Sequence, residues 1–236
     1  MSVLNACTTD WLDLLRAPTL CRMPRPSKVD SPPPLLPAPL PRADRVLVLV
    51  DFINPLDFPG ADRLAPSALQ AARATARLKT KLAEQNVPAI YANDHYGTWH
   101  AEFSDVLRVC LALPGPRGEI ARLLTPAPQD LTILKPRHSA FFATPLDLLL
   151  REMQAKELVI VGLAADMCVQ LTAVEAYMHG YSAWVPADCT AAETTQAKRQ
   201  ALEHMARVMK CSTALSTSRR SHDSVLTRRV RGRPPG

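Results

Sequence analysis

Apolar residues fall into five short runs that predict β-strands, at residues 45–50, 88–93, 131–134, 158–161 and 182–187. The first run, RVLVLV, and the fourth, LVIV, are almost continuous stretches of Leu and β-branched residues. Such stretches are typical of strands that are buried on both faces of a parallel sheet. The pattern therefore predicts a largely parallel sheet with these two segments inside it.

Helical periodicity appears between these runs. Helices are expected at residues 66–85, near Val106, and at 146–154, 166–179 and 194–209, with a short last strand near 210–213. Pro66 is placed well for a first helical turn, and Thr144 followed by Pro145 is typical of an N-cap and first position. Gly180 is a typical residue just beyond a helix end.

The alternation of strands and helices predicts the fold class. Right-handed strand–helix–strand crossovers build an open parallel sheet with helices on both faces. We therefore expect an α/β fold: a three-layer, doubly wound, Rossmann-like sheet of about six mainly parallel strands. The length of 236 residues fits one domain with a full hydrophobic core, which we place at residues 45–216.

Both ends of the chain differ from this core. Eight prolines lie between Pro24 and Pro41, and a segment so rich in proline cannot form a helix or a central strand. Residues 1–44 are therefore expected to be a disordered, Pro-rich extension, or in part the product of a mis-assigned start codon with Met23 or a later residue as the true beginning. Residues 217–236 lack apolar periodicity and are expected to be a disordered basic tail.

The formal net charge of +6 belongs to the ends of the chain. Residues 45–216 hold 17 basic and 17 acidic side chains, whereas 217–236 hold six Arg and one Asp. The charge is therefore no indication of a nucleic acid or membrane partner for the core. In the tail, residues 231–234 (RGRP) resemble the core of an AT-hook, but a single copy is weak evidence and nucleic acid is not an expected partner.

Nothing in the sequence indicates export or membrane insertion. The N-terminal segment lacks the pattern of a secretory signal, because acidic residues and an Arg interrupt its apolar stretch. No run approaches the ~20 apolar residues of a membrane span. The six cysteines show no C-x-x-C or metal-type spacing. We expect a cytoplasmic protein with free thiols.

Three chemically active residues follow three of the predicted strands. Asp51 comes directly after 45–50, Lys135 directly after 131–134, and Cys168 lies in the first turn of the helix after 158–161. Open α/β sheets bind ligands at the carboxyl ends of their strands, so these side chains are expected to meet at one edge. Each has an ordinary alternative: a turn Asp, a solvated Lys, or a Cys that packs as a small hydrophobe.

Together the three residues predict nucleophilic catalysis. A helix N-terminus and a nearby cation stabilise a thiolate, so Lys135 is expected to lower the pKa of Cys168. Asp51 would accept the proton and later pass it to the leaving amine. Backbone N–H groups in the turn 163–168 would stabilise the oxyanion.

The flanks of these residues resemble the isochorismatase-like hydrolases, a family that includes nicotinamidases, carbamoylsarcosine amidases and isochorismatases. The resemblance rests on residues 135–144 (KPRHSAFFAT) and 162–169 (GLAADMCV), and it extends over roughly 45–213. It implies a catalytic triad of Asp51, Lys135 and Cys168. It also implies a cis peptide between Leu163 and Ala164, with the N–H groups of Ala164 and Cys168 forming the oxyanion hole.

The sequence departs from the family pattern in ways that affect substrate and metal. Ile53 replaces the usual Gln after the first strand, while Asn54 remains, and Ala165 replaces the usual Thr before the nucleophile. Tyr96 stands where nicotinamidases have the first His of a metal site. Asp94, His95 and His100 are therefore interpreted as ordinary loop residues, with a metal site formed by these three as the alternative, and neither a metal nor a cofactor is expected.

Four residues after strand ends are candidates for a substrate pocket: Phe52, Asn54, Trp99 and His138. The leading function is hydrolysis of a C–N bond in a small amide or ureido compound through a thioester. The alternatives are vinyl-ether hydrolysis of an isochorismate-type substrate, which does not need the thiol, and a catalytically silent scaffold. The sequence does not identify the substrate. A homo-oligomer is expected by analogy with the family alone.

Overall fold

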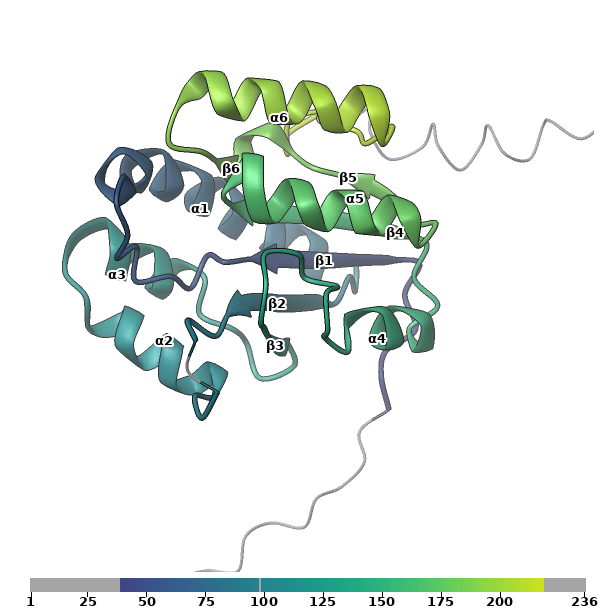
Figure 1. Ribbon diagram of the computed structural model, residues 1–236. Coiled ribbons are helices and arrows are strands. Elements are labelled where there is room, and N and C mark those ends of the chain that lie inside the picture. The colour runs from purple at the N-terminus through teal and green to yellow at the C-terminus, as the bar shows by residue number, and fades with distance from the viewer. Residues whose placement is uncertain (1–38, 98, 219–236) are drawn as a thin grey trace, which may run out of the picture. The chain divides into compact units, whose positions relative to one another are not determined.

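The computed structural model describes residues 39–97 and 99–218 (Figure 1). Most of the predicted extension, Cys7 and Cys21, and nearly all of the basic tail lie outside these residues. Among the described residues, no helix combines the length and the apolar composition needed to cross a bilayer.

A parallel sheet forms the middle of the domain. Its strands are β1 (Arg45–Val50), β2 (Ala89–Asp94), β3 (Leu131–Lys135), β4 (Glu157–Leu163), β5 (Ser182–Trp184) and β6 (Thr190–Ala191). The strand order is β3-β2-β1-β4-β5, with β6 also paired to β4, and every pairing is parallel. The predicted α/β class and the six parallel strands are confirmed.

In the described part of the chain, six α-helices form the two outer layers. They are α1 (Ala61–Ala83), α2 (Phe103–Ala112), α3 (Gly115–Leu123), α4 (Leu146–Glu152), α5 (Gln170–Met178) and α6 (Thr195–Val208). Buried residues of α1, α2 and α3 belong to one hydrophobic cluster, and those of α4, α5 and α6 belong to another. The sheet lies between these clusters, which gives the predicted three layers (Figure 1).

The middle strand contributes to both clusters. Leu47 and Leu49 pack with α1, whereas Val46, Val48 and Val50 pack on the opposite face. Successive side chains of a strand point to opposite faces, so a strand covered on both sides must be apolar at every position. This is why the run at 45–50 does not alternate with polar residues.

The first helix begins earlier than expected. It starts at Ala61, with Gly60 as the N-cap, so Pro66 lies inside the helix rather than in its first turn. Ala61 and Leu64 are both buried, and their burial extends the apolar face upstream of the proline. The proline removes one backbone donor, but the packing of the preceding turn keeps the helix intact.

The segment 111–125, where no helix is predicted, contains helix α3. Pro116 lies in its first turn, where a proline is tolerated because its missing N–H has no intrahelical partner. At Gly118, an added Cβ would lie 1.9 Å from the Leu113 carbonyl oxygen. Glycine there permits the close turn between α2 and α3.

The last strands also differ from the prediction. The strand expected at 182–187 ends at Trp184, and a short 3-10 turn, η3 (Ala187–Cys189), leads into β6. The segment near 210–213 contributes only a single bridge, between Trp184 and Ser212. Pro186 lacks the donor needed to continue a ladder, so the sixth strand is β6.

Candidate active site

Asp51 lies at the carboxyl end of β1, in a tightly held turn. Its backbone φ of 51° is in the left-handed region, which is unfavourable for most non-glycine residues. Its backbone N–H donates to the carbonyl of Ala92 (3.0 Å), and its Oδ1 accepts from the N–H of Asp94 (2.8 Å). Both partners belong to β2, so the neighbouring strand orients this buried carboxylate.

Lys135 is the last residue of β3, and its side chain is fully buried. Its Nζ lies 2.8 Å from Oδ2 of Asp51 and donates to the carbonyl of Arg137 (3.2 Å). Strand β2 separates β3 from β1, a distance of about two strand spacings of ~4.8 Å. The long Lys side chain therefore reaches across β2 to complete the ion pair.

Cys168 lies in the π-helical turn η2 (Ala165–Val169), which joins β4 to α5. The turn is closed by the carbonyl of Ala164, which accepts from the N–H groups of Met167 (3.1 Å) and Val169 (3.2 Å). The peptide between Leu163 and Ala164 is cis. The Sγ of Cys168 is 3.8 Å from Nζ of Lys135, so three residues that are far apart in sequence meet at one sheet edge.

Gly162 sets the spacing of the two central strands beside the turn. It has φ +141°, and an added Cβ would lie 2.0 Å from the carbonyl oxygen of Val50. Gly162 pairs with Val50 in the β1–β4 ladder. The absence of a side chain there lets β4 approach the end of β1 directly before Asp51.

The environment holds Cys168 as a neutral thiol. Burial and, after it, the negative charge of Asp51 raise the pKa of Cys168 to about 12, and Lys135 only partly opposes them. The lowered pKa expected from the sequence is therefore wrong, because the benefit of the cation is smaller than the cost of desolvating the thiolate. The resting thiol must lose its proton during the reaction.

Burial also shifts the pKa values of the two members of the ion pair, Asp51 and Lys135. Burial raises the pKa of Asp51, although Lys135 lowers it in part. Burial alone would lower the pKa of Lys135, but its acidic neighbours, Asp51 foremost, outweigh this effect, so the pKa of Lys135 is raised. The site therefore holds a firmly charged ammonium beside a carboxylate that binds a proton more readily than an ordinary Asp.

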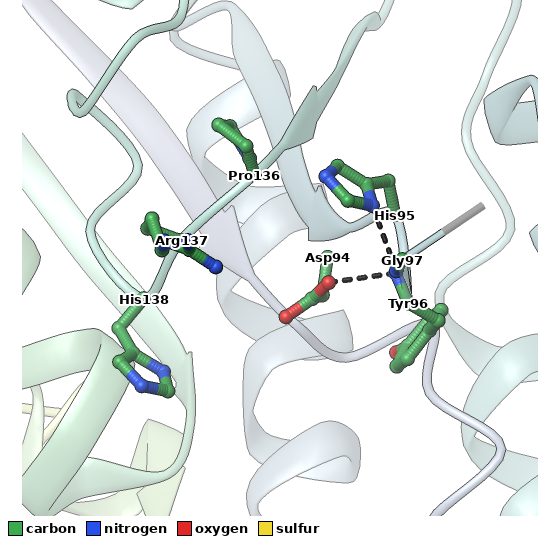
Figure 2. A pocket seen from close by; sticks show the side chains of 7 residues that line it. All are labelled: Asp94, His95, Tyr96, Gly97, Pro136, Arg137 and His138. Atoms are coloured by element: carbon green, nitrogen blue, oxygen red, sulfur yellow. Dashed lines mark hydrogen bonds between the residues drawn. The ribbon is translucent and has the colours of Figure 1, made fainter. Parts of the chain in front are cut away.

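A hollow of about 290 Å³ opens beside these residues (Figure 2). It is lined by Asp94, His95, Tyr96, Gly97, Pro136, Arg137 and His138. The Nδ1 atom of His138 lies 3.6 Å from Sγ of Cys168, so His138 joins the hollow to the thiol. Its volume is at the lower end of ligand pockets and suits a small molecule.

Of the four residues expected to line the pocket, the structure brings only His138 to this hollow. Phe52 is 1% exposed and packs in the core with the α1 layer. The Oδ1 of Asn54 accepts from the N–H of Leu56 (2.7 Å), which stabilises its own turn. Trp99 is 78% exposed and lies against the ring of His95 at a centroid distance of 4.5 Å.

The loop after β2 uses its polar groups locally. Nδ1 of His95 accepts from the N–H of Gly97 (2.8 Å), and Oδ1 of Asp94 accepts from the N–H of Tyr96 (2.7 Å). Within residues 39–97 and 99–218, no three side chains of the metal-binding types gather at one point.

Sequence reasoning missed Arg137 and Tyr96 as residues of the hollow. Both follow a strand end closely, Arg137 two residues after β3 and Tyr96 two residues after β2. Their positions relative to the strands were a usable indication, because loops at the carboxyl edge of a parallel sheet surround the ligand. That the loops after β2 and β3 face each other depends on the pairing of these two strands.

The chain resembles known proteins over most of its length. A family model described as the isochorismatase domain matches residues 45–218. The uncharacterized isochorismatase family protein YaaI of Bacillus subtilis is 34% identical over 168 residues, which are 71% of this chain and 92% of YaaI. The ureidoacrylate amidohydrolase RutB of Methylorubrum extorquens is 43% identical over 67 residues, but the match covers only 28% of this chain and 27% of RutB.

Solved structures show the same fold. The nicotinamidase SaPncA from Staphylococcus aureus matches with a TM-score of 0.57 and 26% identity, over 74% of this chain and 98% of that protein. The match covers nearly all of SaPncA, so the six-stranded domain spans nearly the whole of that fold.

Proposed function

The chain belongs to the isochorismatase family and is a hydrolase, and from this premise we propose that it hydrolyses a C–N bond of a small amide or ureido compound, with Cys168 as the nucleophile. The observation that carries the proposal is the convergence of three side chains: Nζ of Lys135 lies 2.8 Å from Asp51 and 3.8 Å from Cys168. The names of RutB, an amidohydrolase, and SaPncA, a nicotinamidase, support the C–N bond.

In the first step, the sulfur of Cys168 attacks the carbonyl carbon while its proton passes to the carboxylate of Asp51. General base catalysis is required here because the thiol is neutral at ordinary pH. The carbonyl oxygen becomes an oxyanion, which the backbone N–H groups of Ala164 and Cys168 stabilise. Each such donor is typically worth about 3–4 kcal/mol.

In the second step, the C–N bond breaks and Asp51 returns the proton to the leaving amine, so that a thioester remains on Cys168. Asp51, again ionised, then accepts a proton from water as the water oxygen attacks the thioester carbon. Collapse of this intermediate releases the acid, and the sulfur regains a proton from Asp51. The carboxylate thus acts alternately as base and acid.

Lys135 stabilises the negative charge that moves between Asp51 and Cys168 during this proton transfer. Its buried ammonium, paired to Asp51 and close to the sulfur, stabilises negative charge whether the charge resides on the carboxylate or on the sulfur. Without this cation, the low-dielectric surroundings would oppose every anionic state of the cycle.

A panel of small amides and ureido compounds tests the proposal through the release of amine or ammonia. We expect wild-type turnover of at least one compound and none by Cys168→Ala. The matched control is Cys189→Ala, because Cys189 is also buried, in the turn directly before β6, with its pKa raised to about 12. Hydroxylamine added during turnover should intercept the thioester as a hydroxamate.

Turnover by Cys168→Ala equal to that of Cys189→Ala would refute a thioester mechanism. Retained activity of Cys168→Ala on a vinyl ether would assign the site to acid catalysis by Asp51 instead, since that chemistry has no need of a thiol. Circular dichroism of both variants separates loss of chemistry from loss of the fold.

A further inference from the structure

The hollow beside Cys168 has two walls of opposite charge. The segment after β3, with Arg137 and His138, forms one wall, and the loop after β2, with Asp94, forms the other. Figure 2 shows the Arg137 side chain with a nitrogen atom directed into the space between the two segments. The hollow therefore presents a guanidinium and a carboxylate to the same small ligand.

Arg137 differs from most arginines of the domain in having no carboxylate partner. Seven arginines form ion pairs, namely Arg45, Arg63, Arg73, Arg108, Arg117, Arg151 and Arg199. Within the described part of the chain, Arg137 forms none, although the Asp94 carboxylate lines the same hollow. Its planar guanidinium remains available for a bidentate contact with a ligand carboxylate.

The position of the Arg137 backbone is coupled to the reacting groups. Its carbonyl accepts a hydrogen bond from Nζ of Lys135 (3.2 Å), and the next residue, His138, lies 3.6 Å from Sγ of Cys168. A ligand held by the guanidinium is thus held at a defined place relative to the thiol. Binding that holds a substrate in the right orientation relative to the nucleophile increases the reaction rate.

We propose that Arg137 binds a carboxylate of the substrate, so that this hydrolase acts on small amides that carry an anionic group. This inference rests on the proposed function, because it assigns the substrate class of the same site. Asp94 on the facing wall would accept the amide or ureido N–H groups of such a molecule. The hollow volume of about 290 Å³ limits the substrate to a compound of metabolite size.

Two alkylating reagents of equal size test the proposal before any substrate is known. Iodoacetate and iodoacetamide both form an S–C bond with Cys168 and release iodide, but only iodoacetate carries a carboxylate. The ratio of their rate constants at Cys168, followed by peptide mass, measures the preference for an anion. We expect Arg137→Gln to lower this ratio about tenfold, as the loss of a charged hydrogen bond implies, and Arg137→Lys to lower it less.

The control variant is Arg42→Gln. Arg42 is exposed, forms no ion pair among the described residues and lies before β1, at the opposite edge of the sheet. We expect it to leave the ratio unchanged. In the amide panel, carboxylate-bearing compounds should exceed their neutral methyl esters in kcat/KM, and Arg137→Gln should remove that preference mainly through KM.

The two proposals fail in different ways. If both reagents modify Cys168 and the ratio is the same in Arg137→Gln and Arg42→Gln, the anion-binding role of Arg137 is refuted while the nucleophile stands. If Cys168→Ala turns over the amide panel as fast as Cys189→Ala does, the nucleophile itself is wrong, and the substrate class falls with it.

Discussion

Nζ of Lys135 lies 2.8 Å from Oδ2 of Asp51, and the two side chains are 0% and 5% exposed. Removing either member of such a buried ion pair destabilises the protein, because the other charge is then buried without compensation. The pair also has a place in the proposed reaction, since Asp51 carries the proton and Lys135 balances its charge.

The first prediction concerns the stability of this pair. Lys135→Met alone should lower the free energy of unfolding by about 3–5 kcal/mol, because it leaves the Asp51 carboxylate buried without a cation. The double variant Asp51→Asn/Lys135→Met should recover most of this loss. Urea denaturation of the two variants measures both effects.

The exposed pair of Lys156 and Asp44 serves as the control for this comparison. Its atoms are 2.9 Å apart, but both side chains are about two-thirds exposed, and exposed pairs contribute little to stability. We expect Lys156→Met to leave the unfolding free energy nearly unchanged. If Lys156→Met and Lys135→Met lowered the free energy of unfolding equally, burial of the Asp51–Lys135 pair would not make its disruption more destabilising.

The second prediction concerns the titration of the thiol. Burial and Asp51 raise the pKa of Cys168 to about 12, so the wild-type thiolate should not form near the ~8.5 of a free thiol. Asp51→Asn removes a charge that raises the pKa and leaves Lys135 in place. The thiol should therefore become more acidic even though turnover is lost.

Ultraviolet absorbance of the thiolate, compared between each protein and its Cys168→Ala counterpart, measures this titration. Lys135→Met should move the pKa in the opposite direction from Asp51→Asn. A wild-type midpoint below that of a free thiol would contradict the assignment of a neutral resting thiol.

The third prediction is the acid limb of activity. Asp51 must be ionised to accept the thiol proton, and burial raises its pKa above the ordinary 3.8. The value of kcat/KM should therefore rise with pH through this raised pKa, with the limb above pH 3.8. In a Lys135→Met protein with residual activity, the limb should move to higher pH, because the cation that lowers the pKa is gone.

A pH–rate profile with the best amide of the panel provides this measurement, with the folded fraction recorded at every pH. The sign is decisive here. An acid limb that moves to lower pH in Lys135→Met would mean that Lys135 does not stabilise the Asp51 carboxylate.

The fourth prediction concerns Gly162. An added Cβ would lie 2.0 Å from the carbonyl oxygen of Val50, and φ is +141°. Both strands are central and cannot separate freely, so Gly162→Ala should cost at least about 3 kcal/mol of unfolding free energy. Gly180→Ala is the control, because φ there is +87° but no atom lies within 4 Å of the added Cβ.

We expect Gly180→Ala to cost about 1 kcal/mol, from backbone strain alone. The difference between the two variants isolates the close approach of β4 to β1. Equal costs in urea denaturation would mean that strain, and not strand contact, requires glycine at position 162.

Much of the fold was determined locally. The apolar run at 45–50 could only be a strand covered on both faces, and it is β1 in the middle of the sheet. The early start of α1 and the existence of α3 were not visible, because Pro66 suggests a helix start, Gly118 is unfavourable in a helix, and packing overrides both. Local preferences are weak compared with the burial of an apolar face.

The sequence likewise indicated some features of the site, and the tertiary structure decided others. The sequence alone placed Asp51, Lys135 and Cys168 at the carboxyl ends of strands, since each directly follows an apolar run or its turn. It could not show that β2 lies between β3 and β1, so that a long Lys side chain reaches Asp51 across it. Strand order depends on pairings between distant segments, and no local pattern reports them.

Tertiary structure also decided the protonation of the nucleophile. The predicted helix start at Cys168 and the predicted cation, Lys135, indicated a thiolate, whereas burial keeps the thiol neutral. It likewise placed Phe52 in the core and Arg137 in the hollow. Desolvation is the sum of all atoms that surround a group, so it is determined only when the whole chain has packed around it.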